Sequence, residues 1–192
     1  MKLTKYRSYQ DYVKHQKEKT LSIERRKKEA RDFDRKCEDF MAMVARYIEQ
    51  FDIPRGTAVC VGSRAGAEVK ALQQLGFDAI GYDLVAHEPW TLEGDMHELP
   101  VESGVADLVF TNAFDHAADP FRAAGELQRI SKPGGFIIAQ LAIGKSGDKY
   151  KANELARFEE FTSMLPAIEV LSTKGLSGPG RGSINFEVVL KL

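Results

Sequence analysis

The sequence predicts an α/β protein in which a doubly wound, seven-stranded and mostly parallel sheet follows N-terminal helices. From residue 57 on, short apolar runs alternate with helical patterns, which is typical of right-handed βαβ units. The runs are apolar without alternation, as expected for strands buried on both faces. The last two runs, 168–172 and 184–190, are joined by a loop without a helix, so we expect the last strand to pair antiparallel.

The elements divide into an N-terminal helical segment, 1–52, and a βαβ domain, 53–192. Residues 8–51 predict two helices, because apolar residues recur every three or four positions as far as Phe51, and Pro54 then ends the pattern. The expected strands are 58–61, 79–82, 90–92, 106–111, 136–143, 168–172 and 184–190. The expected helices among them are 68–75, one that begins at Asp119 and Pro120, and 151–164.

Composition and charge exclude several classes of protein. No run of about 18 apolar residues and no secretory h-region is present, so we expect a cytoplasmic protein without a membrane partner. The cysteines, Cys37 and Cys60, are too few for a disulfide framework, and no metal-ligand spacing occurs. Residues 1–50 carry 14 Lys and Arg against 9 acidic residues, whereas residues 51–192 carry 13 against 19. The acidic body disfavours nucleic acid as a partner.

Two features of the βαβ domain predict a site for an adenosine-containing ligand. Gly62 and Gly66 lie between the first strand and its helix, where a ligand can approach the backbone and the helix N-terminus. Asp83 ends the second strand, where a carboxylate can accept hydrogen bonds from ribose hydroxyls. Each feature alone has a plainer reading, as a tight turn or a solvated aspartate. Arg64 breaks the dinucleotide pattern G-x-G-x-x-G, and the phosphate loop of nucleotide hydrolases is absent.

Six segments of residues 57–192 form an ordered set of motifs. They are the glycine-rich loop Val61–Gly66, the acid Asp83, Gly94–Pro100 (GDMHELP), Ala106–Val109 (ADLV), Phe114–Pro120 (FDHAADP) and Glu126–Gly135 (ELQRISKPGG). In this order they resemble the class I S-adenosylmethionine-dependent methyltransferases of the small type 11 kind. The resemblance implies a Rossmann-like methyltransferase fold and S-adenosyl-L-methionine as the cofactor. The cofactor-binding residues that it implies are Val61, Gly62, Ser63, Arg64, Gly66, Asp83, Leu84, Asp95, Met96, Thr111 and Asn112.

The resemblance also assigns roles to several of these residues. Asp83 would accept hydrogen bonds from both ribose hydroxyls, and Asp95 with the Met96 backbone would read the adenine edge. Thr111 and Asn112 would lie near the transferable methyl group.

Two residues depart from the family pattern. The family usually has an acid in place of Cys60 and a glycine in place of Arg64, and the acid helps to hold the loop and the ammonium group of the cofactor. We expect Cys60 to be buried in the first strand. Arg64 is expected to point to solvent, with contact to the carboxylate of the cofactor as the alternative.

His116 is the candidate general base, with Asp115 beside it. It follows the fourth strand, at the edge of the sheet where open α/β folds bind ligands, and an oxygen acceptor usually has to lose a proton. The plainer reading of His116 is a residue that shapes its loop. Methyl transfer from a sulfonium needs positioning above all, because the methyl group is already activated.

The expected acceptor is a small molecule, such as a sugar or another anionic metabolite. Lys145, Tyr150 and Arg181 could hold it, and in this family N-terminal helices build lids and acceptor pockets. One alternative is an RNA or protein methyltransferase that uses the basic run 25–28. Another is a non-catalytic cofactor-binding or scaffold protein, which the atypical residues Cys60 and Arg64 suggest.

Overall fold

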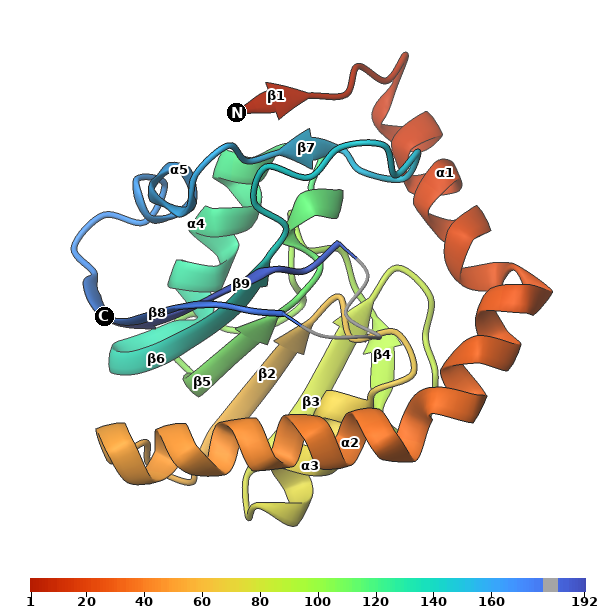
Figure 1. Cartoon of the computed structure of the whole chain (residues 1–192). Helices are drawn as coiled ribbons and strands as arrows, with labels where there is room; N and C mark the ends of the chain where they lie inside the picture. The colour runs from red at the N-terminus through yellow and green to blue at the C-terminus, as the bar shows by residue number, and fades with distance from the viewer. Residues whose placement is uncertain (178–182) are drawn as a thin grey trace.

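The fold is a seven-stranded sheet between two layers of helices (Figure 1). It is known from a computed structural model that describes residues 1–177 and 183–192. The strands of this sheet are β2 (Thr57–Val61), β3 (Asp78–Asp83), β4 (Thr91–Glu93), β5 (Ala106–Thr111), β6 (Ser131–Leu141), β8 (Glu169–Gly175) and β9 (Phe186–Lys191). Their order is β4–β3–β2–β5–β6–β9–β8.

The direction of the strands confirms the predicted architecture. β2 pairs in parallel with β3 and β5, and the parallel pairing continues to β4 on one side and β6 on the other. β9 is antiparallel to both of its neighbours, β6 and β8. The sheet is thus mostly parallel with the last strand antiparallel, as expected for two neighbouring strands that follow each other closely in the sequence.

Helices cover both faces of the sheet and enclose two cores. The helices are α1 (Tyr9–Leu21), α2 (Ile23–Phe51), α3 (Ala67–Gln74), α4 (Pro120–Ile130) and α5 (Phe158–Thr162), with a 3-10 turn at Phe114–His116. Side chains alternate between the faces along each strand. Cys60 and Phe110 therefore pack in the core that α2 and α3 cover, whereas Val59 and Val109 pack in the core of α4.

α2 belongs to the core of the sheet, although it lies in the N-terminal segment. Its buried stripe includes Cys37, Phe40, Val44 and Ile48, as their spacing predicts. The helix ends at Phe51, close to the predicted domain boundary. The two segments nevertheless share one core, so removal of α2 would expose one face of the sheet.

α1 is held much more loosely. It is polar around most of its circumference, and its buried residues are Tyr12 and Gln16. Ser8 and Ser22 begin α1 and α2, each accepting a hydrogen bond from a backbone N–H in the first turn. The helix lies across the end of the sheet at which the parallel strands terminate (Figure 1). An element with so little buried surface is expected to open at low cost.

The predicted helix over 151–164 is wrong for most of its length. α5 covers five residues, and Asn153–Glu154 instead form β7, which pairs antiparallel with β1 (Lys2–Leu3). The side-chain amide of buried Asn153 donates to the backbone carbonyls of Phe114 and Ala117, at 2.7 and 2.9 Å. These tertiary hydrogen bonds outweigh the local helical pattern.

Candidate active site

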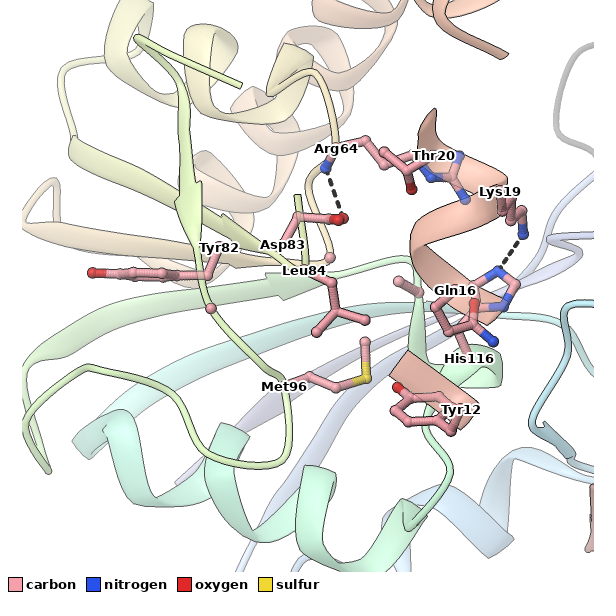
Figure 2. A pocket seen from close by; sticks show the side chains of 13 residues that line it. Tyr12, Gln16, Lys19, Thr20, Arg64, Tyr82, Asp83, Leu84, Met96 and His116 are labelled. Carbon is pink, nitrogen blue, oxygen red and sulfur yellow. Dashed lines mark hydrogen bonds between the residues drawn. The ribbon is translucent and has the colours of Figure 1, made fainter. Parts of the chain in front are cut away.

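A pocket lies where the parallel strands end, beneath α1 (Figure 2). Loops of the sheet contribute the lining residues Gly62, Arg64, Tyr82, Asp83, Leu84, Gly94, Met96, Ala113 and His116. α1 contributes Tyr12, Gln16, Lys19 and Thr20. The structure therefore brings together six of the predicted site residues, namely Gly62, Arg64, Asp83, Leu84, Met96 and His116.

The glycines of the loop after β2 are required by the fold itself. Gly62 has φ +77°, and a Cβ atom there would lie 2.4 Å from the Cβ atom of Ala113. Gly66 has φ +79°, and its Cβ atom would lie 2.2 Å from that of Trp90. Both positions exclude a side chain. Gly62 also lines the pocket.

Asp83 lies on the floor of the pocket with unused acceptor capacity. One carboxylate oxygen accepts from the backbone N–H of Arg64 at 3.1 Å, and the other from that of Val85 at 3.2 Å. Each oxygen can accept a further hydrogen bond. Burial raises the pKa of Asp83, although its hydrogen bonds and Arg64 act in the opposite direction. The carboxylate therefore fits two ligand hydroxyls.

Asp95 is already engaged by neighbouring groups, including one from α1. Its Oδ1 accepts from the backbone N–H of His97 at 2.9 Å and from His97 Nδ1 at 2.7 Å. Its Oδ2 accepts from the Tyr9 hydroxyl. His97 Nε2 accepts from the backbone N–H of Asp119 at 3.1 Å, so the proton is on Nδ1. Burial raises the pKa of Asp95, but the hydrogen bonds from His97 and Tyr9 outweigh it and hold the pKa below its usual value.

The two residues that depart from the family pattern have different surroundings. Cys60 is fully buried, as predicted, and burial raises the pKa of its thiol. The expectation that Arg64 points to solvent is wrong. Its guanidinium lies 3.3 Å from a carboxylate oxygen of Glu29 on α2, and the side chain is 24% exposed. The ion pair turns Arg64 along the mouth of the pocket (Figure 2).

Several predicted site residues do not line the pocket, namely Val61, Ser63, Gly66, Asp95, Thr111, Asn112 and Asp115. The Thr111 hydroxyl accepts from the backbone N–H of Ala113 at 3.3 Å. The Asn112 amide donates to Glu68 at 2.9 Å. Asp115 is buried, 3.6 Å from the Lys151 ammonium. Thr111, Asn112 and Asp115 thus contact other parts of the protein and not the pocket.

His116 has the tautomer that a general base requires. Its Nδ1 lies 2.8 Å from the backbone carbonyl of Tyr150 and therefore carries the proton. Its Nε2 has a lone pair and lies 2.8 Å from the Lys19 ammonium. Burial lowers the pKa of His116, so the imidazole is neutral at neutral pH. Nε2 is therefore unprotonated and could accept a proton, but the Lys19 ammonium covers it.

The resemblance implied that N-terminal helices cover the site, but sequence reasoning missed the residues of α1 that line the pocket. Tyr12, Gln16 and Lys19 are spaced by four and three residues, so they share one helical face, and this spacing was the available signal. Tyr150, proposed as an acceptor residue, stacks its ring on His15 with centroids 4.8 Å apart. Lys145 is not among the lining residues, and Arg181 lies outside the described residues.

The pocket is too small for a nucleoside ligand while α1 is in this position. Its cavity has a volume of about 40 Å³, which is room for a few water molecules. Pockets that hold small-molecule ligands have roughly 300–1,000 Å³. A ligand larger than a few atoms must therefore displace α1 or its side chains.

Comparisons with known proteins agree with this geometry. Residues 59–139 match the family model described as a methyltransferase domain. A malonyl-(acyl-carrier protein) O-methyltransferase of Pectobacterium atrosepticum is 36% identical over 92 residues, which are 46% of this chain and 36% of that protein. An uncharacterized 37.1-kDa protein in a transposon of Streptomyces fradiae is 41% identical over 46 residues, 23% of this chain and 13% of that protein. The chain thus matches only a minor part of either curated relative.

A solved structure shows the same fold over almost the whole chain. The 1,6-didemethyltoxoflavin-N1-methyltransferase of Burkholderia thailandensis, solved with 1,6-didemethyltoxoflavin and S-adenosylhomocysteine, has a TM-score of 0.75 and 11% identity. The similarity covers 98% of this chain and 92% of that one. The fold is therefore the Rossmann-like fold of class I methyltransferases. Within this fold, residues 59–139, which are less than half of the chain, match the methyltransferase domain model.

Two further findings concern the described residues as a whole. Among residues 1–177 and 183–192, none of the helices combines the length and apolar character needed to cross a membrane. In the same part of the chain, no three histidine, cysteine or acidic side chains are grouped so that they could hold a metal ion.

Proposed function

We propose that this protein transfers a methyl group from S-adenosylmethionine to a small-molecule acceptor, such as a sugar or an anionic metabolite. The observation that carries the proposal is the convergence of Gly62, Asp83, Met96 and His116, from four separate segments of the chain, on one pocket at the ends of the strands. In open α/β sheets, ligands bind at this edge.

The residues present fit the cofactor. Asp83 offers two carboxylate oxygens with unused acceptor capacity, which suits ribose hydroxyls. Gly62 lines the pocket without a side chain, so a ligand can approach the backbone of the loop. Asp95 would accept from the adenine amino group once the Tyr9 hydroxyl has left it. Met96 lies beside these groups and offers an apolar surface to the base.

S-adenosylmethionine supplies a methyl group activated by a sulfonium, whose carbon–sulfur bond breaks with the electron pair left on sulfur. The chain supplies position and a proton acceptor. His116 Nε2 takes the proton of an acceptor hydroxyl or amine, while the Tyr150 carbonyl fixes the imidazole through Nδ1. α1 covers the pocket and excludes water, so we assign residues 1–52 the lid and acceptor side of the site.

Titration calorimetry with S-adenosylmethionine on wild-type protein and on Asp83→Ala tests this function. We expect Asp83→Ala to weaken binding more than tenfold, because hydrogen bonds to a charged group are worth roughly 1.5–3 kcal/mol each. Asp78→Ala is the matched control, since Asp78 lies exposed at the opposite end of the same strand, β3.

The outcomes also separate the alternatives. Absence of cofactor binding in the wild type would favour a scaffold protein and contradict the proposal. Cofactor binding combined with salt-dependent binding of RNA would favour the RNA methyltransferase. Equal affinity in Asp83→Ala and the wild type would refute the assigned site.

A further inference from the structure

Three cationic side chains from three elements meet at the mouth of the pocket. Lys19 lies in the last turn of α1, Arg25 in the first turn of α2 and Arg64 in the loop after β2. Their side chains are 11%, 25% and 24% exposed, respectively. Figure 2 shows the Arg64 side chain reaching to Thr20, next to Lys19. Cations with this degree of burial need anionic partners.

The two arginines share one carboxylate. Glu29 on α2 lies 3.3 Å from Arg25 and 3.3 Å from Arg64, and it also accepts a hydrogen bond from Lys36. Arg25 Nε is buried and makes no hydrogen bond within the described part of the chain. Arg25, Arg64 and Lys36 therefore share the single negative charge of Glu29. The two guanidinium groups retain N–H groups that can donate to a ligand.

Lys19 has a still poorer set of partners. Its ammonium donates to a neutral acceptor, His116 Nε2, at 2.8 Å, and lies 3.6 Å from the carboxylate of Asp148. Burial and the nearby Arg64 guanidinium lower the pKa of Lys19 to about 8, although Asp148 and Asp115 act in the opposite direction. A hydrogen bond to a neutral imidazole is weaker than one to a carboxylate. The ammonium is thus held in a buried place without an ion-pair partner at hydrogen-bond distance.

We propose that Lys19 and Arg64, with Arg25 beside them, form a binding site for a carboxylate group of the methyl acceptor. That this pocket binds the methyl donor and the acceptor rests on the function proposed above. A carboxylate would give Lys19 an ionic partner and would take both donors of the Arg64 fork. It would also draw the Lys19 ammonium away from His116 Nε2. Binding of an acidic acceptor would in this way uncover the general base, so that recognition and proton removal are coupled.

The methionine carboxylate of the cofactor is the competing occupant of these cations, and one experiment distinguishes it from the acceptor. Malonate serves as the probe, titrated into the full chain by calorimetry, with and without saturating S-adenosylhomocysteine. The variants are Lys19→Met, Arg64→Met and Lys19→Arg. The control is Lys17→Met, because Lys17 lies on the same helix and pairs with Glu93 at 2.6 Å, away from the pocket.

We expect Lys19→Met and Arg64→Met to lose at least tenfold in malonate affinity, Lys19→Arg to retain most of it, and Lys17→Met to stay within twofold of the wild type. Malonate binding that persists with S-adenosylhomocysteine present assigns the site to the acceptor. Mutual exclusion, with weaker S-adenosylhomocysteine binding in Lys19→Met, would assign it to the cofactor carboxylate and contradict an acceptor site. Equal affinities for both ligands in all five proteins would overturn the proposal.

Nitrogen-15 NMR of His116 provides a readout that a merely structural role of Lys19 would not move. Malonate should shift the Nε2 resonance in the wild type, and in Lys19→Met this resonance should already be at the uncovered position. Malonate binding without any change at Nε2 in the wild type would refute the coupling. If S-adenosylhomocysteine does not bind the wild type, the proposed function fails, whereas malonate titration of the ligand-free chain still tests the carboxylate site.

Discussion

Replacement of Tyr9 by phenylalanine should strengthen cofactor binding. The Tyr9 hydroxyl donates to Asp95 Oδ2, the carboxylate oxygen that the adenine amino group would use. α1 also leaves a cavity of only about 40 Å³, so this helix has to move before a nucleoside can enter. A phenylalanine keeps the ring contacts of Tyr9 with Tyr12 and His97, at centroid distances of 5.3 and 5.6 Å, and removes only the competing donor.

The size of the effect follows from the exposure of Tyr9. A hydrogen bond to a charged group is worth roughly 1.5–3 kcal/mol when it is buried. Tyr9 is 42% exposed, so water replaces part of this energy, and we take about 1 kcal/mol. Ligand affinity falls with the fraction of molecules in the closed state. Loss of about 1 kcal/mol from the closed state therefore raises cofactor affinity by up to about fivefold.

Calorimetric titration of S-adenosylhomocysteine into the wild type, Tyr9→Phe and Tyr6→Phe measures this difference. Tyr6→Phe is the control, because the Tyr6 hydroxyl contacts His15 Nδ1 at 3.3 Å and not Asp95. A weaker affinity in Tyr9→Phe would show that Tyr9 belongs to the bound state. An unchanged affinity would show that the hydroxyl does not compete, and either result refutes the reasoning.

Four further changes have expected outcomes. Deletion of residues 1–21 should leave a folded protein that binds S-adenosylhomocysteine by calorimetry but loses methyl transfer, because α1 covers the pocket and buries only two side chains. Cys60→Asp should lower the free energy of unfolding in urea by more than ~2 kcal/mol, because it places a charge at a fully buried position. Tyr47→Phe should cost roughly 1–3 kcal/mol in the same assay, because buried Glu187 loses a hydrogen bond of 2.5 Å. Lys19 has a folded-state pKa of about 8, below its unfolded value, so its contribution to stability should rise between pH 8 and about 10, and Lys19→Met should abolish this rise.

The sheet could be predicted from the sequence because its strands are apolar without interruption. Val59, Val109 and Ile137 face one core, while Cys60 and Phe110 face the other, so burial on both faces leaves a plain signal. The long helix α2 was predicted for a similar reason, since its buried stripe repeats every three or four residues. Because ligands of open α/β sheets bind at the carboxyl ends of the strands, the predicted strand ends also indicate which loops form the site.

The residues through which α1 lines the pocket could not be predicted in the same way, although the resemblance implied that N-terminal helices cover the site. α1 has almost no apolar stripe, and it contributes to the pocket through the polar residues Gln16, Lys19 and Thr20, which a solvated helix could equally display. The segment 151–164 was predicted as a helix from the spacing of Leu155, Phe158 and Phe161, but the hydrogen bonds of Asn153 to distant carbonyls decide the conformation of its first part. Contacts between residues far apart in sequence leave no local periodicity.

The two departures from the family pattern have separate physical explanations. Cys60 lies in the α2 and α3 core, and the charge of Glu68 adds to burial in raising the pKa of its thiol. An acid in place of Cys60 would stand near a second acid there, so Glu68 on α3 and a cysteine on β2 form a compatible pair. Arg64 has φ +46°, a conformation that costs a non-glycine residue of order 1 kcal/mol. The ion pair with Glu29 offsets that cost, and because it ties the glycine-rich loop to α2, it also sets the guanidinium at the mouth of the pocket, where a carboxylate could use it.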